Sequence, residues 1–285
     1  MGNAAATLAR LDGAGHRHHV AFPGGHVTWR RFGEGPPLVL LHGGHGSWLH
    51  WARNIDELSS RHTLWVPDMP GYGDSSPPVE PTLNALVDAT KITLDKLVGP
   101  STPIGLVGFS FGGLVAATMV VARGAVSQLA LIGPGGHGGP RRPRGELHSW
   151  REAADRHDAA ALAEVMRHNL TMHMLRHAES VDALALHIHT EACMRTRFHS
   201  KASSRGGSLA ALLNAYRGPL LLAWGEHDVT AVPQEVALSL SDGRDGCRTH
   251  VVPRAGHWVQ YEHADRLNSL LMAWLDETSS KDPTT

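Results

Sequence analysis

The segment around Ser110 constrains the fold of this chain more strongly than any other. Residues 104–107 form an apolar run typical of a β-strand, the pentapeptide Gly108-Phe109-Ser110-Phe111-Gly112 follows, and residues 114–122 form a helix-like stretch. A strand that turns sharply into a helix through G-x-S-x-G is the setting of a nucleophile elbow, which holds a serine on a strained turn with its oxygen exposed. Flanking glycines let the strand and the helix pass close to that turn. A glycine-rich turn with a solvent-exposed serine would match the same pattern, so the interpretation depends on partners elsewhere in the chain.

Strand-like and helix-like segments alternate along the chain. Short apolar runs typical of strands lie at residues 27–31, 37–41, 62–66, 104–107, 128–132, 219–224 and 248–252. Helix-like segments lie at residues 49–58, 82–97, 114–122 and 267–275. Repeated alternation of this kind predicts an α/β fold, a mainly parallel sheet with helices on both faces.

One block interrupts the alternation. Residues 133–216 contain no convincing strand: a Gly-, Pro- and Arg-rich stretch that we expect to be a mobile loop precedes a helix-like region. We therefore predict a core at residues 20–133 and 217–277, a helical cap at 134–216, and tails at 1–19 and 278–285. Chemistry in open α/β sheets collects beyond the carboxyl ends of the strands, which favours a cap over helices that only extend the core.

The composition is that of an ordinary soluble globular enzyme. The 285 residues are 42% apolar and 19% charged, with a formal net charge of −1, so a nucleic-acid partner is not indicated. No apolar run approaches the roughly 20 residues that span a bilayer, so we expect no membrane partner. Residues 1–20 lack a secretory-signal layout, and two cysteines are too few for a disulfide framework, so we expect a cytoplasmic protein. The sequence leaves open whether the protein forms a homodimer.

The 21 histidines are scattered and form no zinc-binding spacing. Ordinary surface or pocket histidines therefore account for them better than a metal site does. We expect neither a metal nor another cofactor, and a small molecule as substrate.

A serine hydroxyl needs a base within hydrogen-bond reach, and the base needs an orienting acid. Asp228 directly follows the strand-like run 219–224, and His257 follows the run 248–252. Both therefore belong at the carboxyl ends of strands, at the same sheet edge as Ser110. Along the chain the three residues come in the order Ser, Asp, His, which is the order found in proteins with a nucleophile elbow. Taken singly, Asp228 could be a helix cap and His257 a loop histidine, but their joint placement favours a triad.

Other acids and bases are less suitable. Asp68 and Asp74 lie in the turn after an earlier strand, where Asp74 would brace the turn. Glu226 is two residues before Asp228 and should point in another direction. His227 is a weaker candidate base than His257, because a base and an acid that are adjacent in one loop could hardly align with one serine.

The oxyanion of a tetrahedral intermediate needs two hydrogen-bond donors. One should be the backbone N–H of Phe111, which follows the serine near the start of a helix. The other should come from the loop His42-Gly43-Gly44-His45-Gly46-Ser47, where we choose Gly44 because glycine lets the backbone approach a substrate closely. A plain glycine-rich turn is the alternative for this loop.

These motifs together resemble the α/β-hydrolase superfamily. The resemblance rests on five segments in order, at residues 42–44, 68–75, 108–113, 225–228 and 256–257, and covers residues 24–275. It implies an eight-stranded sheet, a helical cap, and Ser110, Asp228 and His257 as the catalytic triad.

A finer resemblance concerns residues 256–265, which look like the C-terminal motif of the meta-cleavage-product hydrolases. Those enzymes cleave a carbon–carbon bond in vinylogous diketone acids. They usually carry asparagine where Phe109 stands, and a cap arginine where our alignment places His189, with Arg195 and Arg197 nearby. Phe109, Phe111 and Trp258 would give the pocket apolar walls that suit an aromatic or aliphatic acyl group. The predicted substrate pocket comprises His42, Gly43, Phe109, Trp258, His189 and Arg195.

The leading interpretation is a cofactor-free serine hydrolase that acts on a small apolar or aromatic carbonyl compound, with a carboxylic ester ahead of a 2-hydroxy-6-oxo-dienoate. A haloalkane dehalogenase or epoxide hydrolase is disfavoured because those relatives carry aspartate at the nucleophile position, whereas a perhydrolase shares the triad. The alternative from another class is a non-catalytic ligand-binding protein of the same fold.

Overall fold

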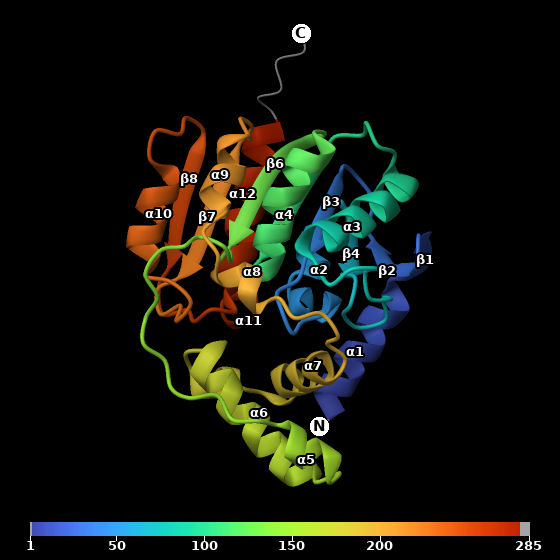
Figure 1. The fold of residues 1–285 in the computed structure, drawn as a ribbon, viewed down its shortest axis with the longest axis vertical. Helices are drawn as coiled ribbons and strands as arrows, with labels where there is room; N and C mark the ends of the chain where they lie inside the picture. The colour runs from blue at the N-terminus through green and yellow to red at the C-terminus, as the bar shows by residue number, and fades with distance from the viewer. Residues whose placement is uncertain (1, 280–285) are drawn as a thin grey trace.

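An eight-stranded sheet runs through the molecule (Figure 1), in a computed structural model that describes residues 2–279. The strands are β1 (His16–Phe22), β2 (Gly25–Phe32), β3 (Pro37–Leu41), β4 (Thr63–Asp68), β5 (Ile104–Phe109), β6 (Val126–Ile132), β7 (Leu220–Gly225) and β8 (Cys247–Val252). Their order is β1-β2-β4-β3-β5-β6-β7-β8; the β1–β2 and β2–β4 pairs are antiparallel, and the other five pairs are parallel. The predicted fold class is confirmed.

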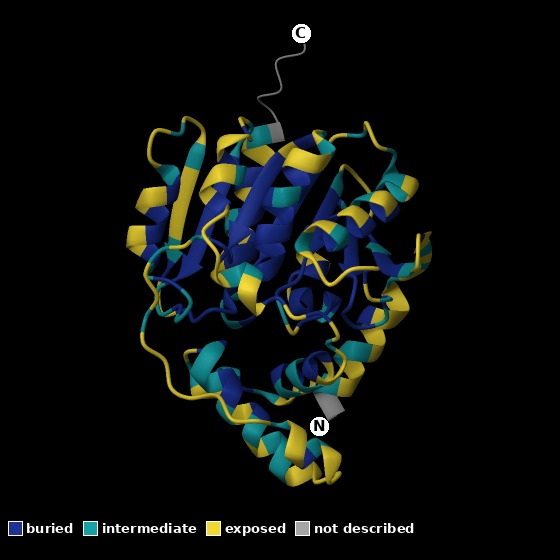
Figure 2. Cartoon of the chain, viewed as in Figure 1, coloured by how far each residue is buried: buried dark blue, intermediate teal, exposed yellow. Residues whose placement is uncertain are grey.

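Helices cover both faces of the sheet because the central strands are apolar on both sides. Leu38 and Leu40 of β3 join the apolar cluster of one face, and Val39 and Leu41 join that of the other. The first face is covered by α2 (Ile55–Ser59), α11 (Val259–Glu262) and α12 (Ala264–Ser279), and the second by α3 (Leu83–Val98), α4 (Phe111–Arg123) and α10 (Pro233–Ser241). Figure 2 shows the result: the inner strands are buried, and exposed residues lie on the outer helix surfaces.

The segment between β6 and β7 forms helices and no strand. It contains α5 (Arg151–Asp155), α6 (Ala159–His173), α7 (Ala183–Met194), α8 (Lys201–Arg205) and α9 (Leu209–Asn214), with a short 3-10 turn at Ala178–Ser180. The helices α5, α6 and α7 lie beyond the carboxyl ends of the strands (Figure 1). In contrast, α9 packs on the sheet layer, because Leu209 and Leu213 share an apolar cluster with Val115 of α4. Residues 209–214, which we assigned to the cap, therefore pack as part of the core.

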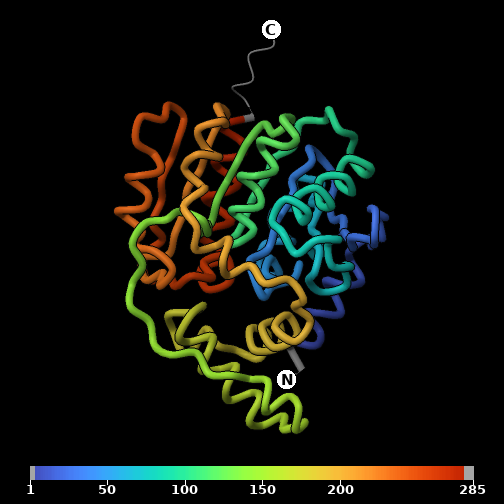
Figure 3. Tube along the Cα trace, viewed as in Figure 1, coloured from blue at the N-terminus to red at the C-terminus, as the bar shows by residue number. Residues whose placement is uncertain are grey.

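The amino-terminal residues are not a tail, contrary to the expectation for residues 1–19. Residues 2–14 form α1 (Gly2–Ala14) and the next strand is β1. Leu11 of α1 is fully buried, and the helix packs beside α7. In Figure 3 the blue α1 and the yellow α7 therefore lie side by side. At the other end, α12 continues to Ser279, and residues 280–285 of the predicted tail lie outside the described residues. Among residues 2–279, no helix is both long and apolar enough to cross a bilayer.

Candidate active site

Ser110 lies on a strained turn between β5 and α4. Its backbone has φ 53° and ψ −118°, a left-handed φ that is costly for a residue with a side chain. The turn needs glycine on both sides: a methyl group on Gly108 would lie 2.4 Å from the carbonyl oxygen of Gly112, and one on Gly112 would lie 2.3 Å from that of His42. The sequence pattern thus forms the elbow geometry that we expected from it.

Ser110, His257 and Asp228 form a continuous hydrogen-bonded chain. The Ser110 Oγ lies 3.0 Å from His257 Nε2, and His257 Nδ1 lies 2.8 Å from Asp228 Oδ2. The three residues follow β5, β8 and β7, so the parallel sheet brings them to one edge although Ser110 and His257 are 147 positions apart. His257 can therefore accept the serine proton while Asp228 orients the imidazole.

Asp228 is held as a carboxylate. Burial favours its neutral form, but attraction to His257 and the hydrogen bonds from His257 and Thr230 outweigh burial and lower the pKa of Asp228 below its ordinary value. Thr230 donates both its backbone N–H and its hydroxyl to Asp228 Oδ1, each at 2.7 Å. Both carboxylate oxygens are therefore engaged, which fixes the plane of the group that faces the imidazole.

The competing acids are engaged elsewhere. Asp68 accepts hydrogen bonds from Arg30, from the backbone N–H of Trp48 and from that of Asp74. Asp74 is ion-paired with Arg30 at 2.9 Å, so it braces the turn as expected. Glu226 accepts the backbone N–H of Arg254 at 2.8 Å and points away from the triad.

The loop after β3 places Gly44 beside the serine. His42 bridges two loops: its Nδ1 donates to the Gly43 oxygen at 2.7 Å and its Nε2 accepts the backbone N–H of Met69 at 2.9 Å. The Gly43 N–H donates to His50 Nδ1 at 3.2 Å, so that amide is already used. Gly44 and Phe111 both line the cavity, and Phe111 starts α4, where the first amides have no partner within the helix. Gly44 and Phe111 therefore remain the candidates for oxyanion donors.

Ser110 opens on a cavity of about 680 Å³ between the sheet edge and the insertion. Of the six predicted pocket residues, Phe109 and His189 line it, whereas His42, Gly43, Trp258 and Arg195 do not. His42 and Gly43 are occupied by the loop hydrogen bonds. Trp258 is fully buried, donates its ring N–H to the His50 oxygen at 3.0 Å and stacks on Tyr261.

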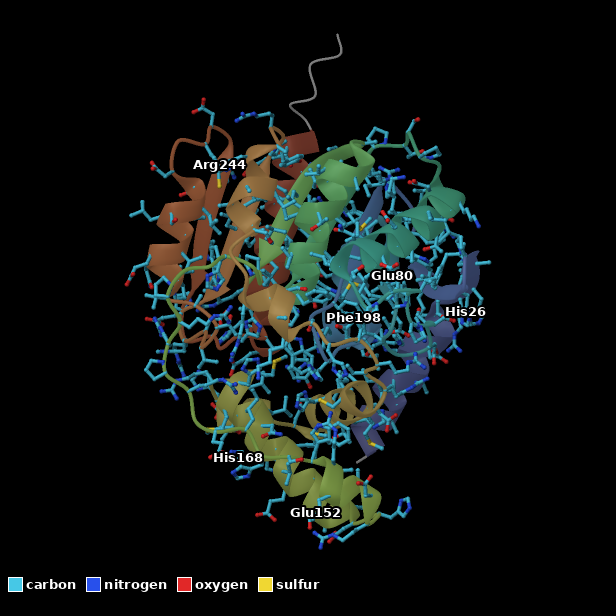
Figure 4. All side chains as sticks on the ribbon, in the orientation of Figure 1. His26, Glu80, Glu152, His168, Phe198 and Arg244 are labelled. Carbon is cyan, nitrogen blue, oxygen red and sulfur yellow. The ribbon has the colours of Figure 1, made fainter. Side chains whose placement is uncertain are left out.

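Arg195 lies outside the cavity because it pairs with Asp74 in the turn after β4. The pairing joins the end of α7 to the core, so the role of this arginine is structural contact between the two parts. Phe198, labelled in Figure 4, makes a second contact from the same segment: its ring stacks on Phe111 with the centroids 5.7 Å apart.

Four histidines of the insertion line the cavity, and of these only His189 was predicted: His137, His148, His173 and His189. His189 of α7 is half-buried, and desolvation lowers its pKa to about 4. His173, at the end of α6, was missed; its ring centroid lies 5.6 Å from that of His257, and burial, with the positive charge of His257 and Arg144, lowers its pKa to about 3. Both imidazoles are therefore neutral near pH 7, so neither supplies a fixed charge beside the serine.

Comparison with known proteins assigns the class. The family described as the alpha/beta hydrolase fold matches residues 36–264, and the chain belongs to this family. The protein is a hydrolase, as are relatives and solved structures to which it is similar.

Among these relatives is a 2-hydroxy-6-oxononadienedioate/2-hydroxy-6-oxononatrienedioate hydrolase of Paraburkholderia phymatum, 31% identical over 84% of this chain and 87% of the relative. A 2-hydroxy-6-oxo-6-phenylhexa-2,4-dienoate hydrolase of Burkholderia cepacia is 28% identical over 85% of this chain and 88% of the relative. The resemblance to meta-cleavage-product hydrolases is thereby confirmed.

Solved structures of both kinds of hydrolase share the fold. A meta-cleavage product hydrolase of Pseudomonas fluorescens superposes with a TM-score of 0.71 at 23% identity, covering 91% of this chain and 97% of that structure. The naproxen esterase of Bacillus subtilis superposes with a TM-score of 0.73 at 20% identity, covering 95% and 96%. The fold is therefore common to carbon–carbon hydrolases and esterases and does not separate them.

Proposed function

We propose that this chain is a serine esterase with Ser110 as nucleophile, His257 as general base and acid, and Asp228 as the orienting carboxylate. The observation that carries the proposal is the hydrogen-bonded chain from Asp228 through His257 to a serine that opens on a cavity. No other carboxylate described above competes for His257.

The reaction proceeds in two halves. Ser110 Oγ attacks the ester carbonyl while His257 Nε2 takes its proton, and Gly44 and Phe111 donate their amides to the oxyanion. His257 then protonates the leaving alcohol, and the carbon–oxygen bond breaks to give an acyl-enzyme. Water attacks the acyl group with His257 as base, which releases a carboxylic acid and restores Ser110. One water is consumed for each ester.

The walls next to Ser110 favour an apolar acyl group. Phe109, Phe111, Met174 and Cys193 line the cavity, and burial raises the pKa of the Cys193 thiol to about 12, so the thiol is uncharged. An aliphatic or aromatic acyl group would bury apolar surface there, at about 25 cal/mol per Å².

A second candidate is hydrolysis of a carbon–carbon bond in a 2-hydroxy-6-oxo-dienoate, because the relatives carry that activity in their names. In this reaction the bond next to the attacked carbonyl carbon breaks, and the departing carbon takes the proton. We place it second because His189 is neutral where those enzymes usually carry arginine, and Phe109 stands in place of asparagine.

Two substrates separate the candidates. The purified protein is assayed with 4-nitrophenyl butyrate and with a 2-hydroxy-6-oxo-dienoate, whose visible absorbance disappears on cleavage. We expect ester turnover that Ser110→Ala abolishes. Bleaching of the dienoate with higher kcat/KM than the ester would support the second candidate. A well-folded protein that turns over neither would support a non-catalytic ligand-binding role.

A further inference from the structure

The charged side chains that line the active-site cavity are all cations. They are Arg141, Arg142, Arg144, Arg151, Lys201 and Arg205, defined here as the cationic mouth. Among the described residues no aspartate or glutamate lines the cavity. The whole chain carries 26 lysines and arginines and 27 acidic residues, so this one-sided lining does not follow from the overall composition.

The cationic mouth lies at the opening, not beside the serine. Five of its six residues are exposed and Arg142 is half-buried, whereas Phe109 and Phe111 in the depth are fully buried. The charges come from three segments: the loop between β6 and α5, the first residue of α5, and α8. The positive charges are therefore more exposed to solvent than the two phenylalanines beside Ser110.

These cations have no acidic partners within the described part of the chain. None of the six forms an ion pair there, in contrast to Arg10 and Arg248 elsewhere on the surface and to the buried Arg30. Arg141 donates only to the carbonyl oxygen of Ser204, at 2.9 Å. Burial and the nearby charges of Arg205 and Arg144 lower the pKa of Arg141, and these effects outweigh the attraction of Asp228, which raises it.

Positive charge also acts on two histidines that line the cavity, His45 and His173. The pKa of His45 is lowered by burial and by the charges of His199 and Arg151, and the charge of Arg144 adds to the effect of burial on His173. Cations that repel one another around a hollow favour the entry of anions and attract them from a distance. Arginine in particular binds phosphate and carboxylate through two parallel hydrogen bonds.

We propose that the cationic mouth binds an anionic group, phosphate or carboxylate, at the end of the substrate remote from the scissile carbonyl. The apolar acyl or alcohol portion then occupies the depth beside Ser110. Cleavage of such a ligand rests on the proposed esterase function, whereas binding of the ligand does not.

Matched esters test the proposal. Phenyl butyrate is compared with 4-(butyryloxy)benzoate and 4-(butyryloxy)phenyl phosphate, which add one and two negative charges to the leaving group. In a second arm, 4-nitrophenyl hexanoate is compared with the mono-4-nitrophenyl ester of adipic acid, which places the charge on the acyl side. We expect kcat/KM to rise about tenfold or more with charge in at least one arm, and to fall with added salt.

A double variant identifies the residues responsible. R141A/R205A should lower kcat/KM for the preferred anionic ester about tenfold more than kcat/KM for the matching neutral ester. Arg217→Ala is the control. Arg217 is an exposed cation just before the amino-terminal end of β7, whereas the cavity lies beyond the carboxyl ends of the strands, and it is not among the residues that line the cavity. It should change neither ester.

Binding separates this proposal from the esterase proposal. Titration calorimetry of Ser110→Ala with 4-(butyryloxy)phenyl phosphate, phenyl butyrate and the mono-adipate ester needs no turnover. Tighter binding of an anionic ester, lost in R141A/R205A, supports the proposal even when no ester is hydrolysed. Equal affinity and equal kcat/KM for charged and neutral members of both arms would overturn it, and the cationic mouth would then be only a solvated surface.

Discussion

In the proposed mechanism Asp228 acts through the imidazole that it orients, so its removal should affect catalysis more than folding. Asp228→Asn keeps the size of the side chain but lets an amide N–H face His257 Nδ1, which favours the wrong tautomer. We expect kcat for 4-nitrophenyl butyrate to fall on the order of 10³–10⁴-fold. Steady-state kinetics measure the loss, and circular dichroism checks that the fold is retained.

Asp74→Asn is the matched control for that variant. Asp74 is the carboxylate that braces the turn after β4, outside the cavity lining. Its loss should affect stability and leave kcat within about threefold, since exposed or partly exposed ion pairs contribute about 1 kcal/mol or less. An equal loss of kcat in both variants would contradict the proposal that Asp228 orients the imidazole of His257.

For single residues, the sequence predicts the position of those that follow the end of a strand. Ser110, Asp228 and His257 could be placed together because each directly follows a parallel strand. Arg195 could not be placed correctly, because its partner Asp74 is 121 positions away. His173 was missed since one histidine in a helix of mixed composition carries no signal of the cavity that it faces.

The elbow is an element whose geometry depends on close backbone contact. Gly108→Ala should destabilise the protein by roughly 1–3 kcal/mol or more, because its methyl group would lie 2.4 Å from the Gly112 oxygen in the rigid start of α4. Gly13→Ala in α1 is the control: its methyl group meets nothing within 4 Å, and alanine favours helix. Urea unfolding measures both, and equal midpoints in the two variants would contradict the close contact.

A second element, α11, links the insertion to the loop of His257, the proposed general base. The Glu262 carboxylate accepts the backbone N–H groups of Arg176 and His177, each at 2.8 Å, and that of Gly256, at 2.6 Å. Glu262→Ala leaves three amides without this partner, which should cost about 1–3 kcal/mol and lower kcat, because Gly256 precedes His257.

Thermal unfolding and ester kinetics of Glu262→Ala test this coupling. Glu235→Ala removes an exposed carboxylate from the first turn of α10 and should leave both quantities unchanged. An unaltered Tm and kcat in Glu262→Ala would show that the three hydrogen bonds do not hold the histidine loop.

Elements with a strong apolar pattern were predictable, and those stabilised by tertiary contacts were not. The strand at Pro37–Leu41 is almost entirely apolar, so its sequence identifies it. In contrast, β1 has the sequence HRHHVAF and is largely exposed at the sheet edge, and α1 is an alanine-rich helix in which Leu11 is fully buried. Pairing with β2 and packing against α7 stabilise these two elements, and neither is visible in the local sequence.

The molecule as a whole should lose stability in mild acid. The pKa of buried His42 is lowered from 6.5 to about 4 by desolvation, and those of His173 and His189 are lowered to about 3 and about 4. Between pH 6.5 and 4 the unfolded chain therefore binds more protons than the folded one, so the free energy of unfolding falls as pH falls. Below about pH 4, protonation of Asp228, whose pKa is lowered, adds to the loss.

Urea unfolding at pH 8, 6 and 5 measures this dependence. His42 alone should contribute roughly 3 kcal/mol across the full window. His42→Gln keeps a donor and an acceptor for the Gly43 oxygen and the Met69 N–H, and its unfolding free energy should vary less with pH. A pH dependence equal in the variant and the wild type would contradict the assignment to His42.

The central claim is that Ser110 is a nucleophile activated by His257, and covalent labelling tests it most directly. The protein is treated with a fluorophosphonate and the adduct is located by peptide mass spectrometry. The account predicts one adduct, on the peptide that contains Ser110, with its rate of formation greatly reduced in His257→Ala and no adduct in Ser110→Ala. A folded wild-type protein that stays unlabelled, or that is labelled only at another residue, would contradict it.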